Sequence, residues 1–207
     1  MSIKLKSEHH TLTDWDFQYG AAGRLLDNST YISEPTSLKM FTTNGRMRSA
    51  ILCRIPGTLV LPQGEVRTWI RVTRPNYCPA MFRNQSPLGN PTFLNCYYIW
   101  LAYTTASLHR FVDGADTGVA YTTCYTVALT WVHYRTFWYN GKTPGDVPAL
   151  CVDLYREIAG EWSKMGDTLY DTDNMWKDSE INRTGVWAWV ADNEDEWYDD
   201  TEIWGPV

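Results

Sequence analysis

Two adjacent aspartates near the end of the chain, Asp199 and Asp200, have the residue type and the surroundings for chemistry. They are set between aromatic residues in the stretch WYDDTEIW (197–204). Carboxylate oxygens are ligands that calcium prefers, they accept hydrogen bonds from hydroxyl groups, and paired carboxyl groups catalyse glycoside hydrolysis. The same residues could also form an acidic border on a closing strand, with a structural role alone.

Histidine and arginine side chains offer a second kind of chemistry. His133, Tyr134 and Arg135 are adjacent, and a polysaccharide lyase needs a Tyr and His pair facing an Arg. Neighbouring residues on a strand point to opposite faces, so His133 and Arg135 share one face and Tyr134 lies on the other. We interpret His133 and Arg135 as a buried, satisfied pair rather than as a catalytic base and its partner.

The aromatic residues favour a third activity, the binding of glycans. The chain has 11 Trp and 13 Tyr, and sugar rings stack on the faces of exposed aromatic side chains. In GVWAWVA (185–191), alternation places Trp187 and Trp189 on the face opposite a small apolar one, ~6.5–7 Å apart along the strand. Trp138 and Tyr139 lie at another strand end. We predict these four residues as the glycan-binding or partner-binding site; core packing and a protein interface are the alternatives.

Composition and charge exclude several classes of partner. The net charge is −6, with 44% hydrophobic and 20% charged residues, which is ordinary for a globular protein. Residues 167–207 carry 12 acidic and 2 basic residues, and without a basic run we expect no nucleic-acid partner. No segment approaches the ~20 apolar residues of a membrane span. The N-terminus has no apolar signal region, so we expect synthesis in the cytoplasm without a signal peptide.

The cysteine pattern argues against a disulfide framework and against a zinc knuckle. The count is odd and no C-x-x-C occurs; the five residues are Cys53, Cys78, Cys96, Cys124 and Cys151. We expect free thiols, buried in the case of Cys124 and Cys151.

The elements that must position these residues are strands. Segments rich in β-branched and aromatic residues alternate with turn sequences, and no segment keeps a 3.6-residue period over helical length. The strand-like segments are 66–73, 97–103, 119–132, 133–139, 149–156 and 185–191. With no internal repeat and no linker, residues 1–207 are expected to form a single all-β domain, an antiparallel sandwich or barrel.

The order of several motifs resembles the concanavalin A-like (laminin-G/glucanase-type) jelly-roll superfamily. The motifs in chain order are WDFQYG (15–20), TSLKM (36–40), LPQGEVRTWIRV (61–72), YYIWLAYTTASLHRFVDG (97–114), TWVHYRTFWYNG (130–141), EW (161–162) and NRTGVWAWVADNEDEWYDDTEIW (182–204). The resemblance implies a two-sheet antiparallel sandwich in which the N- and C-terminal strands are adjacent. We expect residues 15–20 to lie in the strand beside residues 197–204.

The resemblance also bears on the two aspartates. It implies that a structural Ca2+ could be held by Asp199 or Asp200 on the last strand, with no other cofactor required. It further implies that a glucanase would carry an E-x-D-x-x-E pattern, and this sequence has none. DTDN (171–174) resembles the start of an EF-hand loop, but Trp176 and Asn182 replace the required Gly and Glu, which rejects that site.

Together these observations predict a non-catalytic surface-recognition or assembly module. Its partners would be carbohydrate or other virion or surface proteins, with no membrane partner, and it could form a homo-oligomer. By analogy of fold we expect a virion component, such as a decoration, tail or fibre-associated protein, acting on the virion or outside the cell. The alternative is a glycoside hydrolase or polysaccharide lyase with a non-standard active site on the same fold.

Overall fold

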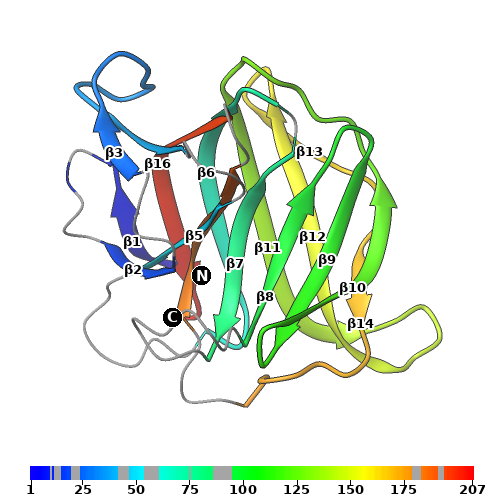
Figure 1. Ribbon diagram of the computed structural model, residues 1–207. Helices are drawn as coiled ribbons and strands as arrows, with labels where there is room; N and C mark the ends of the chain where they lie inside the picture. The colour runs from blue at the N-terminus through cyan, green and yellow to red at the C-terminus, as the bar shows by residue number, and fades with distance from the viewer. Residues whose placement is uncertain are drawn as a thin grey trace.

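The computed structural model describes residues 1–9, 11, 15–19, 24–41, 47–53, 61–74, 76–85, 95–178, 183–190 and 194–207, without the side chains of 16–19, 24, 47–53 and 189–190. In these ranges the regular structure consists of strands, which form two antiparallel sheets (Figure 1). The described residues include no helix long and apolar enough to cross a membrane. The predicted all-β, two-sheet sandwich is confirmed.

The first layer is a nine-stranded sheet whose strands come from both ends and the middle of the chain. Its order is β13 (Glu161–Lys164), β12 (Pro148–Ile158), β11 (Val132–Lys142), β6 (Gly64–Val72), β16 (Asp195–Gly205), β4 (Ser37–Phe41) and β3 (Arg24–Asp27), with β1 (Ser2–Ser7) beside β16 and β14 (Leu169–Asp171) beside β12.

The second layer is a seven-stranded sheet. Its order is β10 (Ala115–Thr123), β9 (Thr105–Val112), β8 (Cys96–Leu101), β7 (Cys78–Asn84), β15 (Arg183–Val190), β5 (Met47–Cys53) and β2 (Trp15–Tyr19).

Alternation along the strands builds the core between the layers. Along β11, Val132, Tyr134, Thr136 and Trp138 are buried, whereas the residues between them are half-buried on the outer face. Strand β6 repeats this pattern next to it, because the two strands pair in register from Val132 opposite Ile70 onwards. One apolar cluster joins inward side chains of both sheets. The period of two thus places every second side chain of β6 and β11 outside, where a ligand can meet them.

The two chain ends lie next to each other, as expected, but through a different strand. Strand β1 pairs with β16 from Ser2 opposite Gly205 to Ser7 opposite Thr201, and both termini lie in the same part of Figure 1. Residues 15–19 form β2, which pairs with β5 in the other sheet. The prediction that residues 15–20 neighbour 197–204 is therefore wrong. The strand-like pattern of that motif is real, but a pattern does not say which sheet receives a strand.

Strand β16 contains a β-bulge that reverses its alternation. Asp199 is opposite Trp69 and Glu202 is opposite Arg67, so Asp200 and Thr201 share one position on the partner strand. Such an extra residue moves every later side chain to the other face. Tyr198 and Ile203 are both fully buried in the core as a result. A strict two-residue alternation would place Tyr198 on the same face as Asp200, Glu202 and Trp204, and the bulge breaks that alternation.

Candidate functional site

A pocket of about 320 Å³ opens on the outer face of the nine-stranded sheet. Six strands supply its walls. The lining residues are Lys6 of β1, Arg67 and Trp69 of β6, His133 of β11, Glu157 of β12, Trp162 of β13, and Asp200 and Glu202 of β16. Three of these eight residues carry aromatic rings and the other five are charged, so the pocket combines flat ring surfaces with many polar groups.

Register brings the aromatic side chains of the pocket together. Trp69 lies directly opposite His133 in the pairing of β6 with β11, and their rings stack with centroids 4.7 Å apart and planes 9° apart. On its other side His133 contacts Trp162, at 4.8 Å between ring centroids. The three half-buried rings therefore form a continuous aromatic wall across β6, β11 and the edge strand β13.

Charged groups hold this wall in place. His133 Nδ1 lies 2.6 Å from Glu157 Oε2, so the carboxylate fixes the orientation of the imidazole ring. The guanidinium of Arg67 lies 4.6 Å from the ring centroid of Trp204 and 5.9 Å from that of Trp162, within the range of a cation–π contact.

Glu65 holds the side chain of Arg67 in position. The Glu65 carboxylate is almost fully buried, and its Oε1 accepts a hydrogen bond from Arg67 Nε. Its Oε2 lies 2.6 Å from Nη2 of Arg135. Arg135 shares the outer face of β11 with His133, as predicted, and each of the two is half-buried with an acidic partner. The two residues are thus half-buried rather than buried and pair with carboxylates rather than with each other, and Arg135 Nε is buried without a hydrogen-bond partner among the described residues.

The bulge aims Asp200 at the pocket. Asp200 has a φ of 43°, in the left-handed region that few non-glycine residues adopt. Its Oδ2 accepts a hydrogen bond of 2.7 Å from the Ser33 hydroxyl, whereas its buried Oδ1 has no partner among the described residues. Bulges, positive φ values and unsatisfied polar atoms gather at functional sites, where they re-aim a side chain. Asp200 combines all three.

Asp199 has a structural role in this arrangement. It is fully buried, and its carboxylate accepts backbone N–H bonds from Ile32 (2.7 Å), Ser33 (3.1 Å) and Asp200 (2.9 Å). Burial raises the pKa of Asp199 above its usual value. Both oxygens are already used, and the described residues contain no group of three or more His, Cys, Asp or Glu placed to hold a metal. The donor set at Asp199 therefore does not fit the calcium site that the fold implies.

The structure places the four aromatic residues predicted to bind glycan in different surroundings. Trp187 and Trp138 are fully buried; Trp187 packs against Tyr98 at 4.5 Å between ring centroids, and Trp138 Nε1 donates to the Leu61 carbonyl at 3.2 Å. A ring with no exposed face cannot stack on a sugar, so these two assignments are corrected to core residues.

The other two predicted residues differ from these. Trp189 is part of β15, and its side chain lies outside the described atoms. Tyr139 is half-buried on the outer face of β11, stacked on Phe137 at 5.1 Å between ring centroids, and it does not line the pocket. The alternation of β15 was predicted correctly, since Val186 and Ala188 face the core, but the opposite face of this strand is covered as well.

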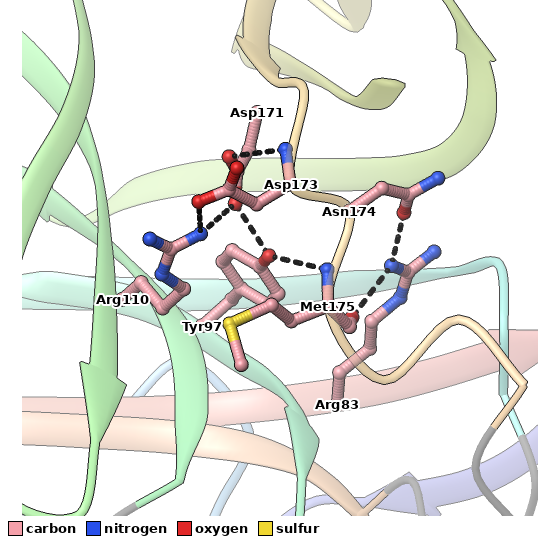
Figure 2. A network of polar contacts seen from close by, with 7 residues as sticks. All are labelled: Arg83, Tyr97, Arg110, Asp171, Asp173, Asn174 and Met175. Atoms are coloured by element: carbon pink, nitrogen blue, oxygen red, sulfur yellow. Dashed lines mark hydrogen bonds and ion pairs between the residues drawn. The ribbon is translucent and has the colours of Figure 1, made fainter. Parts of the chain in front are cut away.

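The acidic segment that begins at Asp171 is held by arginine rather than by a cation of the EF-hand type. Figure 2 shows Arg110 reaching both Asp171 and Asp173, each at 2.8 Å. The Tyr97 hydroxyl donates to Asp171 at 2.5 Å and accepts the backbone N–H of Met175 at 3.0 Å. This network ties the chain after β14 to the seven-stranded sheet.

Arg83 extends the same network into the core. This fully buried side chain donates to Asn174 Oδ1 at 2.7 Å and to the Met175 carbonyl at 3.2 Å, and further to the Pro62 carbonyl and Asn140 Oδ1. Burial lowers the pKa of Arg83 to about 10. Rejecting an EF-hand here is consistent with these contacts, because protein side chains neutralise the acidic pair.

Sequence reasoning missed Trp69 and Trp162. A signal for Trp69 was present, since in VRTWIRV it shares the polar face of the strand with Arg67 and Arg71. An indole among charged residues on the outer face of a strand is a stronger indication of a binding site than an indole flanked by valines. Trp162 gave no comparable signal, because only the pairing of β12 with β13 brings it to Glu157.

Comparison with known proteins identifies the fold and no family. No protein-family model matches the chain, and no curated protein matches it. The exoplasmic/lumenal domain of VIP36, in a Ca2+/Man3GlcNAc-bound form, is similar at 14% identity over 94% of this chain and 86% of that chain, with a TM-score of 0.55. The marine PL-14 alginate lyase from Aplysia kurodai is similar at 8% identity over 91% of this chain and 89% of that chain, with a TM-score of 0.56. The carbohydrate esterase vb_24B_21 from the Shiga toxin-encoding bacteriophage phi24B is similar at 11% identity over 100% of this chain and 99% of that chain, with a TM-score of 0.51.

These matches span nearly the whole chain at very low sequence identity, and the proteins differ in activity. They therefore report on architecture alone. The chain has the concanavalin A-like jelly-roll fold that the order of its motifs predicts.

Proposed function

We propose that this protein is a carbohydrate-binding module whose ligand occupies the pocket on the outer face of the nine-stranded sheet. One observation carries the proposal: two half-buried indoles, Trp69 and Trp162, line the same pocket as the carboxylates of Glu157, Asp200 and Glu202. Sugars present apolar C–H faces and a ring of hydroxyls, so a site that combines flat aromatic surfaces with carboxylates meets both needs.

The charges of the pocket narrow the class of sugar. Arg67 shares the carboxylate of Glu65 with Arg135, His133 is paired with Glu157, and Lys6 is paired with Glu8 outside the pocket. Asp200 and Glu202 form no ion pair with a described side chain. An acidic sugar would place its carboxylate beside these two groups at a cost in free energy. We therefore propose a neutral sugar as the ligand.

The test is a glycan array probed with the purified chain, followed by calorimetric titration of the strongest ligand. Trp162 lies on the short edge strand β13, so Trp162→Ala should leave the melting temperature nearly unchanged. It should weaken binding about tenfold or more, which corresponds to ~1.4 kcal/mol. Tyr125→Ala is the matched control, because Tyr125 is an aromatic residue that is 72% exposed and lies outside the pocket. Equal affinity in the two variants would reject the site.

We further propose a virion as the setting, with the module serving as a decoration, tail or fibre-associated component and assembling as a homo-oligomer. The fold shared with a bacteriophage protein supports this context. Mass photometry of the purified chain tests the oligomer, and a monomer at micromolar concentration would argue against it.

A second candidate function is hydrolysis or elimination at the same pocket. The observation that favours it is the 2.6 Å contact between His133 Nδ1 and Glu157 Oε2 on the pocket wall, since such a pair can move a proton. Incubating the array ligand with the wild type and with Glu157→Gln decides between the functions. Cleavage by the wild type alone would make the protein an enzyme, whereas an intact ligand in both supports a binding module.

A further inference from the structure

Three side chains on the outer face of the seven-stranded sheet form a relay outside the glycan pocket. Ser107 and His109 are two residues apart on β9, so both point to the same side, and Asp116 lies on the neighbouring strand β10. His109 Nε2 is 2.9 Å from Ser107 Oγ, and His109 Nδ1 is 3.1 Å from Asp116 Oδ1. Serine, histidine and aspartate therefore follow one another in hydrogen-bond contact.

The roles of the two ring nitrogens follow from the partners. An ionised carboxylate only accepts, so Nδ1 carries the proton that is donated to Asp116, and Nε2 of the neutral ring accepts the Ser107 hydroxyl. The other acceptor near Ser107 Oγ, the Trp100 carbonyl, is more distant at 3.4 Å. This is the arrangement in which a histidine acts as general base toward a serine and an aspartate holds its tautomer.

Neighbouring groups fix the orientation of the relay. The Tyr98 hydroxyl donates to the second oxygen of Asp116 at 2.8 Å, and burial raises the pKa of Tyr98, which keeps its donor proton in place. The Tyr98 ring also stacks on His109, with centroids 4.9 Å apart. Both the aspartate and the imidazole are thus held by one rigid side chain from the buried strand β8.

The exposure of the three side chains increases from Ser107 to His109 to Asp116. Ser107 is 4% exposed, whereas the side chains of His109 and Asp116 are 19% and 32% exposed. Ser107 pairs with Trp100 on β8 and with Tyr121 on β10, so an aromatic residue flanks the serine on each neighbouring strand. Tyr121 is 65% exposed, and an exposed side chain can change rotamer within nanoseconds, which gives a small group access to the serine.

Gly118 is part of the same construction. It lies opposite His109, and a Cβ at this position would be 2.0 Å from the Tyr121 hydroxyl oxygen and 3.5 Å from Cε1 of His109. The absent side chain therefore leaves the space that the Tyr121 hydroxyl needs beside the imidazole ring.

We propose that Ser107, His109 and Asp116 form a hydrolytic site for small acyl esters, separate from the glycan pocket. Ser107 Oγ adds to the ester carbonyl and its proton passes to His109 Nε2. The C–O bond to the alcohol then breaks, and the alcohol leaves with that proton. A water molecule adds to the acyl-serine, gives its proton to His109, and the acid departs as Ser107 regains the proton. The low exposure of Ser107 restricts the acyl group to the size of acetyl.

The experiment labels the full-length chain with a fluorescent fluorophosphonate, which reacts with activated serines, and locates the label by peptide mass spectrometry. Hydrolysis of 4-nitrophenyl acetate and 4-nitrophenyl butyrate is measured in parallel. We expect the label on Ser107 and faster turnover of the acetate. Asp116→Asn should lower both signals at least about 100-fold, because the amide can stabilise the wrong tautomer of His109.

Two variants complete the test. Ser107→Ala should abolish labelling and hydrolysis, whereas Ser163→Ala, at an exposed serine of β13 in the other sheet, should match the wild type. An unlabelled Ser107 in the wild type, or hydrolysis that persists in Ser107→Ala, would overturn the proposal. Glycan binding should be the same in Ser107→Ala and in the wild type, so the two sites can fail independently.

Discussion

Asp199 is the side chain on which the loop at Ile32 and Ser33 depends. Its buried carboxylate accepts three backbone N–H groups, and in Asp199→Ala these donors would lose their acceptor. Since hydrogen bonds to a charged group contribute about 1.5–3 kcal/mol each and are not additive, we expect the variant to lose at least about 3 kcal/mol of unfolding free energy. Urea denaturation measures the loss, and a variant as stable as the wild type would contradict this role.

Asp199 also predicts a pH dependence of stability. Burial raises its pKa in the folded protein above 3.8, the usual value of an aspartate, so between these two values the folded state binds more protons than the unfolded state. The contribution of Asp199 to the unfolding free energy is therefore fully present below about pH 3.8, and it is lost as the pH rises through the raised pKa of the folded state. The stability of the wild type minus that of Asp199→Asn should fall over this window, as followed by thermal melts. A difference that rises with pH would refute the assignment.

At the scale of the strand, the bulge in β16 decides which residues face the pocket. Its extra residue, Asp200, has a φ of 43°, which glycine adopts without strain and a β-branched residue adopts only at a cost of about 1–2 kcal/mol. Asp200→Val should therefore be less stable than Asp200→Gly by about that amount in urea denaturation. Both variants lose the Ser33 hydrogen bond, so each serves as the control of the other. Equal stabilities would mean that the backbone is not constrained at this position.

The segment after β14 offers a second test at this scale. Met175 donates its backbone N–H to Tyr97, whose hydroxyl is held by Asp171. Asp171→Asn should weaken both the hydrogen bond with Tyr97 and the ion pair with Arg110. The amide of Met175 should then exchange with solvent at least about tenfold faster, which corresponds to a loss of ~1.4 kcal/mol in the free energy of local opening. Hydrogen exchange by mass spectrometry measures the rate, with the loop at 143–146 as an internal reference. An unchanged rate would contradict the role of the network.

The strands were predictable because their information is local. In ALCVDLYR (149–156), for example, alternation alone places Leu150, Val152 and Leu154 on one face and Asp153 on the other, and the structure has the three apolar residues in the core and Asp153 paired with Lys164. The pocket was not predictable, because it depends on which strands are neighbours and on a bulge that a two-residue period cannot show. Whether a face such as that of Trp187 is exposed depends on what covers it. Alternation predicts that two side chains share a face of the sheet, but it does not predict whether other residues cover that face.

At the scale of the whole molecule, closing the nine-stranded sheet joins the two chain ends. Strand β1 covers the second half of β16, and the buried His9 continues this contact through Nε2 and the Thr201 hydroxyl, 2.8 Å apart. Removing residues 1–9 would leave that half of β16 as an exposed edge. We expect the truncated chain to melt at least about 2–4 °C lower, which corresponds to ~1 kcal/mol or more, and to aggregate at lower temperature. A truncated chain with the melting temperature of the full chain would contradict the closure.

If the outer face of the nine-stranded sheet binds a sugar, as we propose, the indole N–H signals of the tryptophans in its pocket should respond to the ligand. A chain labelled with ¹⁵N at tryptophan and titrated with the strongest array ligand reports on each indole by NMR, once single Trp→Phe variants assign the signals. Trp69 and Trp162 line the pocket, whereas Trp15 and Trp138 are buried in the core. We predict that the signals of Trp69 and Trp162 shift together with one dissociation constant while those of Trp15 and Trp138 stay in place. Shifts confined to tryptophans outside the pocket, with Trp69 and Trp162 unmoved at saturation, would contradict the claim.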